Sequence, residues 1–161
     1  MRHPVHALFR VTVLAILLAI PGRAFADAAP DPDEAVDQIT QMNRDAVTAY
    51  QAKKYEDARK VLKQALDLAA SAGLDKHAIK ARTHIHLGIV IIVGFKQRDL
   101  GIKQFRKAIE IQGDIGLTKS LITPELTDAM RKATSGVVED VKKRAGADLV
   151  ARVQAETAKA K

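Results

Sequence analysis

Two stretches of this sequence decide its fold: YEDARKVLKQALDL, residues 55–68, and LGIKQFRKAIEI, residues 100–111. Aligned at an offset of 43 residues, they match small residues to small ones and large apolar residues to large apolar ones, in the pairs Ala58 and Gly101, Leu62 and Phe105, Ala65 and Ala108, Leu66 and Ile109, and Leu68 and Ile111. Apolar residues recur three or four apart, which predicts that both stretches are helices. Internal similarity of this kind is typical of stacked helical hairpins.

A further helix is predicted in front of each stretch. The first begins at Asp31, an N-cap that is followed by Pro32 in the first turn and by Glu34 as the partner of a capping box. It continues to about residue 52 with apolar positions three or four apart, at Val36, Ile39, Met42, Ala46, Ala49 and Tyr50. After a tight turn comes the second helix, residues 55–72, which we expect to end at Gly73.

The second pair consists of a helix over about residues 76–93, capped by Asp75, and a helix over about residues 99–112. The segment LGIVIIVGF, residues 87–95, is rich in β-branched side chains and, taken alone, would suit a buried strand. Because helical sequence flanks it on both sides and the sequence offers no other strand to pair with it, we expect a helix that is buried on several faces.

The C-terminal third is predicted to be less regular. After a loop over residues 113–123, Pro124 indicates the start of a fifth helix, which we expect Ser135-Gly136 to interrupt. Residues 135–161 would then form a basic tail that is weakly helical or flexible, with a break near Gly146 and a frayed end. Its lysines and arginines suggest a weak contact with an anionic membrane surface, and plain solvation is the alternative.

The pattern resembles the tetratricopeptide repeat (TPR). The second helix of that repeat follows Y-x-x-A-x-x-x-[FYL]-x-x-A-[LI], which this sequence fills with Tyr55, Ala58, Leu62, Ala65 and Leu66. The first helix of the repeat carries a large and then a small residue near its middle, which match Met42 and Ala46 and again Leu87 and Gly88. The resemblance covers roughly residues 38–112, with an offset longer than the usual repeat of about 34 residues.

The resemblance implies an all-α fold in which antiparallel helical hairpins stack as a short TPR-like α-solenoid over residues 31–134. Small residues would let the helices of a hairpin cross closely, while large ones fill the gap to the next hairpin. These structural positions are Tyr55, Ala58, Leu62, Ala65, Leu66, Gly88, Gly101, Phe105, Ala108 and Ile109. Because two repeats are fewer than the three or so that stability usually requires, we expect a C-terminal capping helix, the fifth, or a second subunit to close the stack.

The resemblance also implies where a partner binds. In that family the first helix of each hairpin lines a concave surface that receives a peptide. By position, this surface would contain Asn43, Val47, Tyr50, Arg82, Ile85 and Ile89. Their mixture of amide, cation and apolar groups suits an extended or helical peptide. The alternative is that Val47, Ile85 and Ile89 are core residues.

The N-terminus predicts export. A basic start leads into an apolar run over residues 11–20, which is too short for a permanent span of a bilayer roughly 30 Å thick. A small-x-small sequence follows, so we expect residues 1–26 to be a signal peptide cleaved between Ala26 and Asp27 and residues 27–30 to be a linker. An uncleaved anchor is the alternative. Export predicts a periplasmic or extracellular location.

Composition narrows the classes of partner. The formal charge of +7 falls to +4 once the three arginines of the first 26 residues are removed, since no acid goes with them. This excess is too diffuse for nucleic-acid binding, which usually needs a concentrated basic face. Cysteine is absent, so an exported chain of this length must rely on its hydrophobic core without disulfides.

Patterns typical of catalysis or metal binding are missing from the sequence. His84 and His86 stand two apart, which puts them on different sides of a helix and makes a poor metal pair. None of the serines lies in a Gly-x-Ser-x-Gly elbow, and there is no cysteine nucleophile or glycine-rich phosphate loop. We therefore expect no enzymatic activity, no metal and no cofactor.

Two functions remain as predictions. The first is an exported, periplasmic TPR-like adaptor or scaffold that binds another envelope protein or a peptide of it. The alternative is a non-enzymatic structural subunit that self-associates into a homo-oligomer by burying the apolar third helix.

Overall fold

The described part of the chain, residues 30–159 of a computed structural model, is helical and contains no strand. Its elements are α1 (Pro32–Gln51), α2 (Tyr55–Ser71), α3 (Ala78–Phe95), α4 (Arg98–Ile111), the 3₁₀ turn η1 (Lys119–Leu121) and α5 (Pro124–Lys159). The predicted all-α class is confirmed, and residues 87–95 form a helix rather than a strand. The predicted signal peptide and nearly all of the linker lie outside the described residues.

Hydrogen bonds and backbone conformation at the helix ends explain where the helices begin and end. Two of the three predicted end residues are confirmed, and the predicted cap of the third helix is not. The Asp31 side chain accepts hydrogen bonds from the backbone N–H groups of Asp33 and Glu34, at 2.9 and 3.1 Å, so it caps α1 as predicted. Gly73 ends α2 with a φ of +71°, a conformation that costs glycine little. The predicted cap of the third helix is wrong. Its N-cap is His77, because Asp75 instead pairs with Lys80 at 2.5 Å.

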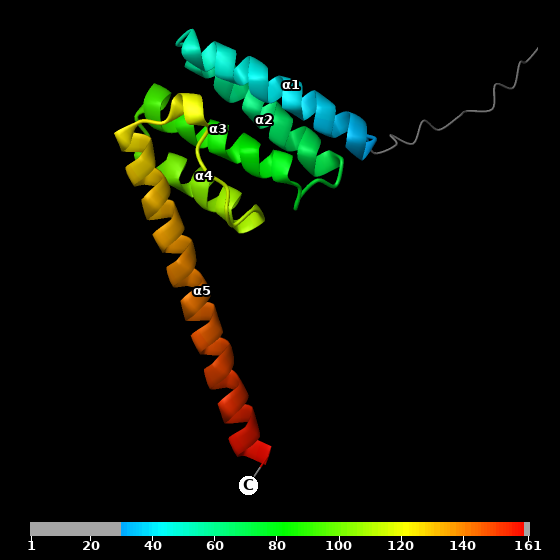
Figure 1. The fold of residues 1–161 in the computed structure, drawn as a ribbon. Helices are drawn as coiled ribbons and strands as arrows, with labels where there is room; N and C mark the ends of the chain where they lie inside the picture. Colours follow the sequence, from blue (N-terminus) through cyan, green and yellow to red (C-terminus); the bar gives the residue numbers. More distant parts are fainter. Residues whose placement is uncertain (1–29, 160–161) are drawn as a thin grey trace, which may run out of the picture.

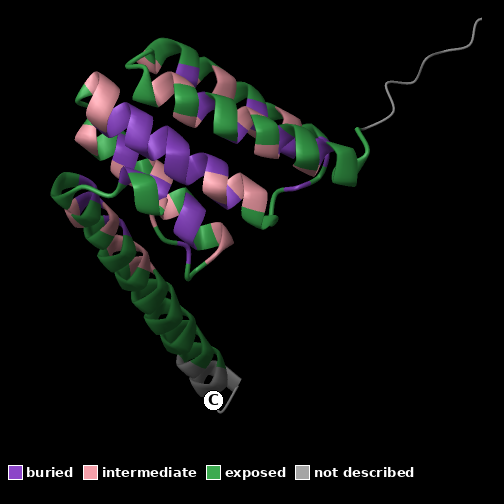
Figure 2. Cartoon of the chain, turned by 45° about the horizontal axis from the view of Figure 1, so that its top comes forward, coloured by how far each residue is buried: buried purple, intermediate pink, exposed green. Residues whose placement is uncertain are grey.

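Helix α3 is the centre of the fold. It packs against α1, α2 and α4, and every residue from 83 to 92 is buried (Figures 1 and 2). Among the described helices, only α3 is long and apolar enough to cross a membrane, and 56% of it is buried within this fold. Its β-branched residues therefore serve packing against neighbouring helices, as the flanking helical sequence indicated.

Two glycines bring α3 and α4 together. A Cβ added at Gly88 would lie 2.5 Å from Cε1 of Phe105 and 3.0 Å from the carbonyl oxygen of Gly101. A Cβ added at Gly101 would lie 2.8 Å from the carbonyl oxygen of Gly88 and would also overlap Ile92. The two backbones thus approach each other directly, and the Phe105 ring is fully buried beside them.

The first pair, α1 and α2, joins α3 through a second set of small residues. Ala46 of α1 and Ala58 of α2 are buried in one cluster with Leu62 and with the α3 residues Leu87, Val90 and Ile91. Of the ten predicted structural positions, eight are buried, and the remaining two, Tyr55 and Leu66, are half-buried. Small residues therefore lie at the helix contacts of both pairs, in the places where the internal alignment puts them.

Helix α5 is one continuous helix of 36 residues, so the predicted interruption at Ser135-Gly136 and the break near Gly146 are wrong. Serine and glycine weaken a helix by only about 0.5–1 kcal/mol each, so single residues of these types do not have to end it. At Gly136 a contact comes from Arg106 of α4, whose guanidinium lies over the glycine and pairs with Asp140. Residues 135–159 are therefore helical, as in the helical one of the two alternatives predicted for this segment.

The N-terminal part of α5 covers the second pair, and the rest leaves the body. Leu126, Ala129 and Ala133 are fully buried in the cluster that also contains Ile85, Ile89 and Phe105. Beyond about residue 140 the helix projects away from the other helices (Figure 1). The described residues therefore form a body of four helices, α1–α4, from which α5 extends.

Replacing Gly101 with alanine should lower the free energy of unfolding by about 1–3 kcal/mol, because the new methyl group overpacks the contact between α3 and α4. Gly146→Ala is the control. No heavy atom lies within 4 Å of a Cβ added there, so this change should stabilise α5 slightly, by up to about 1 kcal/mol. Chemical denaturation measures both. Equal stability of Gly101→Ala and wild type would contradict the close approach.

Candidate functional site

A hollow of about 350 Å³ lies between α1, α3 and the connection from α4 to α5. Its lining residues are Thr40, Asn43, Arg44 and Val47 from α1, Ile79, Arg82 and His86 from α3, and Thr118 from the connection. The periodicity of the two helices explains the set, since residues three or four apart share one face. Both helices that the sequence predicted to line a partner groove therefore contribute to this hollow.

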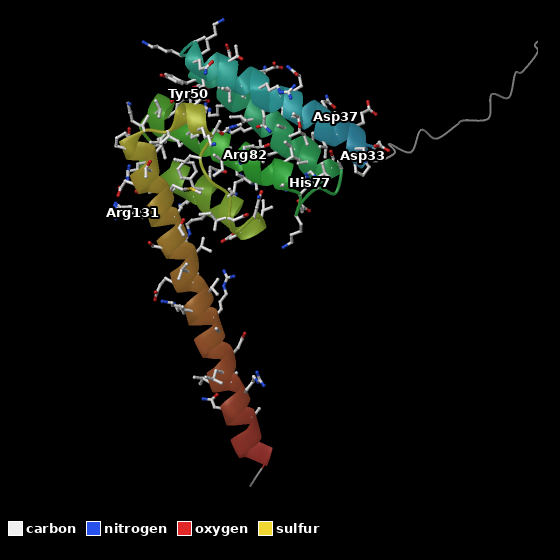
Figure 3. All side chains as sticks on the ribbon, in the orientation of Figure 1. Asp33, Asp37, Tyr50, His77, Arg82 and Arg131 are labelled. Carbon is white, nitrogen blue, oxygen red and sulfur yellow. The ribbon has the colours of Figure 1, made fainter. Side chains whose placement is uncertain are left out.

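Three of the six predicted groove residues, Asn43, Val47 and Arg82, line the hollow. Tyr50 lies one turn further along α1, half-buried, with its ring centroid 5.8 Å from that of Tyr55 (Figure 3). Burial raises the pKa of its hydroxyl above the ordinary value.

Two of the six, Ile85 and Ile89, are core residues. Their exposed fractions are 0% and 1%, and they pack in the cluster that contains Phe105. The prediction that they face a partner is therefore wrong, and the alternative that the sequence left open holds for both. Val47 packs at the edge of the same cluster but stays partly exposed, so it belongs to both the core and the hollow.

A chain of buried and part-buried hydrogen bonds forms the floor of the hollow. The Asn43 amide nitrogen donates to the Thr83 hydroxyl at 2.9 Å, and that hydroxyl donates to the Ile79 carbonyl at 2.9 Å. The Asn43 amide oxygen lies 3.2 Å from His86 Nδ1, and His86 Nε2 lies 2.9 Å from the Thr118 hydroxyl. Since an amide oxygen only accepts, Nδ1 donates to it, and Nε2 of the neutral ring accepts from Thr118.

Two hydrogen bonds hold the connection between α4 and α5 in place, and this connection forms a wall of the hollow. Thr118 is tied to α3 through His86, and Arg82 Nη1 donates to the Gly116 carbonyl at 2.8 Å. No buried side-chain nitrogen or oxygen in the described residues lacks a hydrogen-bond partner. Unpaired buried polar groups are costly, so the complete pairing fixes the geometry of the floor and wall.

The charge of the hollow is one-sided. Arg44 and Arg82 are among its lining residues, and no carboxylate is. His86 is neutral at neutral pH, because burial, and secondarily the charge of Arg82, lower its pKa to about 4. Apolar surface from Val47 and Ile79 lies beside the two cations. This arrangement suits an apolar group next to a negative charge or to hydrogen-bond acceptors, such as peptide carbonyls.

Sequence reasoning missed five of the eight lining residues: Thr40, Arg44, Ile79, His86 and Thr118. A signal for His86 was present, because the 43-residue offset that aligns the second helices also places His86 on Asn43, and these two residues contact each other. Thr118 carries no such signal, since its role depends on where the connection folds. His84 lies outside the hollow and is paired with Gln104 at 2.9 Å, and burial lowers its pKa.

Within residues 30–159, no group of three histidine, aspartate or glutamate side chains could hold a metal ion. Comparisons of the chain with protein-family models, with curated proteins and with solved structures give no match.

Stability should fall as the pH falls from about 6.5 to about 4, because of His86. In the unfolded chain this imidazole binds a proton near pH 6.5, whereas in the folded chain it does so only near pH 4. Between these pH values the unfolded state binds more protons than the folded state. This difference lowers the free energy of unfolding by up to about 3 kcal/mol at pH 4. Chemical denaturation of wild type and of His86→Gln between pH 7.5 and 4 measures it. The stability advantage of wild type should shrink over this range, and an advantage independent of pH would refute the burial of a neutral ring.

Proposed function

We propose that this chain is an exported, TPR-like module that binds a segment of another envelope protein in the hollow between α1 and α3. The observation that carries the proposal is that α1 and α3, the first helices of the two aligned pairs, line the same hollow. In the family that the sequence resembles, the partner binds on the first helices.

Two features support the TPR-like arrangement. The pairs α1 with α2 and α3 with α4 are each joined by extensive helix contacts, and α2 with α1 packs onto α3. The aligned residues Ala58 and Gly101 both lie at buried helix contacts, as do Ala65 and Ala108. The first part of α5 takes the role of the capping helix, because it covers α4 with buried Leu126, Ala129 and Ala133.

The size and chemistry of the hollow indicate how the partner binds. A volume of about 350 Å³ is at the lower end for small-molecule sites and accommodates a few side chains of a peptide. Arg44 is exposed at the rim and is free to approach a carboxylate or a backbone carbonyl of the partner, whereas Arg82 already holds Gly116. We therefore assign partner contact to Arg44 and Val47, and a supporting role to Arg82.

A binding role fits the hollow better than a catalytic one. His86 is the only lining residue whose side chain is of a kind that commonly serves as a general base, and both of its ring nitrogens are engaged within the fold. A general base needs a free nitrogen within reach of the substrate proton. We accordingly propose an adaptor without enzymatic activity and without a cofactor.

The alternative, self-association through the third helix, lacks a free surface in the described structure. Residues 83–92 of α3 are already buried by the other helices of the same chain. Homo-oligomer formation would therefore have to use another part of the molecule.

A photoreactive benzoylphenylalanine at position 44 should cross-link the partner, because this position lies at the rim of the hollow. The experiment is done in intact cells, and mass spectrometry identifies the attached peptide. The control carries the same residue at position 63, an exposed lysine on α2 that is not among the lining residues. Cross-linking of one protein from position 44 and not from position 63 supports the proposal. Identical products from both positions would rule out the hollow as the binding site.

A charge reversal provides a second test. Arg44→Glu should weaken binding of the identified partner about tenfold or more, a loss of about 1.4 kcal/mol. Lys63→Glu makes the same charge change away from the hollow and should leave the affinity unchanged. Isothermal titration with the purified partner measures both. An unaffected Arg44→Glu variant would remove Arg44 from the site.

A further inference from the structure

The C-terminal half of α5 exposes apolar residues that no part of the described chain covers. Every residue from 141 to 152 is exposed. The exposed fractions of Val138, Val141, Leu149 and Val150 are 48%, 57%, 62% and 57%. An isolated helix of about 12 residues, the length of this exposed run, is only marginally stable in water. Most helices in proteins are stabilised by packing of one face. This half of α5 has such a face without a partner among the described residues.

Three of these four residues lie on a single stripe of the helix, from which Val150 points away, and this stripe differs from the side that packs on the body. Val138, Val141, Ala145 and Leu149 follow one another at intervals of three or four residues, so they lie along one side of the helix. At 100° per residue, this side is roughly 120° away from the side formed by Leu126, Ala129 and Ala133. The stripe is therefore free for a second helix while α5 stays docked on α4.

We propose that the stripe binds α5 of a second copy of this chain in antiparallel orientation, with a twofold axis at Ala145. In this register Ala145 faces Ala145 of the second copy, and Val141 faces its Leu149. The small alanine at the centre lets the two helices approach closely. Val138 lies against the aliphatic stem of Arg152 of the second copy. Each contact occurs twice, because a twofold interface is self-complementary.

The charges agree with a second copy as the occupant. Arg144 and Asp148 lie on the same flank of the stripe, so the antiparallel register brings Arg144 of each copy next to Asp148 of the other. Over residues 137–159 five basic side chains oppose four acidic ones, which leaves a net charge of +1. Two such helices repel each other little. The same near-balance gives only weak attraction to an anionic membrane, which needs a cluster of cations.

This assembly would separate the two hollows. Because the helices pair through their C-terminal halves, the four-helix bodies lie at opposite ends, with the first residues of the two α5 helices roughly 60 Å apart at 1.5 Å per residue. The dimer would offer two binding sites to one partner or to two. Pairing through α5 does not depend on the function proposed for the hollow.

Single cysteines test the register directly, because the chain contains no cysteine of its own. Under mild oxidation, Ala145→Cys in the protein isolated from cells should form a covalent dimer, since the axis places residue 145 opposite itself. Ala147→Cys lies on the opposite side of the helix and should cross-link at least about tenfold more slowly. Equal rates at the two positions, or no dimer from Ala145→Cys, would overturn the proposal.

Matched charge insertions test the stripe in solution. Sedimentation should give wild type a mass of twice the chain at about 20 μM, a concentration suited to micromolar affinity. Val141→Glu should weaken the dimer at least about tenfold, because it buries a carboxylate in the seam. Val150 has the same exposed fraction as Val141 but lies off the stripe, so Val150→Glu should leave the dimer intact. Circular dichroism confirms that both variants fold.

Two outcomes would refute the second copy as occupant. One is a wild-type protein that stays monomeric under these conditions. The other is a monomer that binds vesicles of phosphatidylcholine and phosphatidylserine and loses this binding in Val141→Glu but not in Val150→Glu. That result would assign the stripe to a membrane surface instead.

Discussion

The structure depends on the direct contact between the backbones of α3 and α4 at Gly88 and Gly101. A Cβ at either position would overlap the opposite helix, so only glycine permits this distance. The contact lets Phe105 fill the space beside it and places α3 in the middle of the body, where residues 83–92 are all buried. A helix buried on all sides must satisfy its polar side chains within the protein. This constraint produces the hydrogen bonds of Asn43, Thr83 and His86.

Those hydrogen bonds connect the packing of the core to the candidate site. His86 joins α3 to α1 through Asn43 and to the α4–α5 connection through Thr118. The floor of the hollow is therefore rigid, while its rim carries the exposed Arg44. The hollow and the stripe on α5 lie on separate elements of the fold. The proposed partner binding therefore does not block the proposed self-association.

The sequence predicted the parts of the fold that repeat a local pattern. The start of α1 at Asp31, the stop at Gly73 and the buried small residues follow from propensity and periodicity. Features set by tertiary contacts escaped prediction. Arg106 of α4 supports α5 across Gly136, and Lys80 draws Asp75 away from the cap. For the site, Asn43, Val47 and Arg82 were found from the positions of the first helices. The sequence did not distinguish whether Ile85 and Ile89 face a partner or the core. Both residues are covered by neighbouring helices, and the positions of these helices follow from tertiary packing instead of local pattern.

Because α3 packs against α1, α2 and α4, these four helices should unfold as one cooperative unit. Native-state hydrogen exchange at increasing denaturant measures this cooperativity. The amides of α1, α2 and α4 should then converge with those of residues 83–92 on a single opening reaction that has the free energy of global unfolding. If α1 and α2 open together at a distinctly lower free energy, while α3 and α4 stay protected, the two pairs unfold independently and α3 does not join them into one unit.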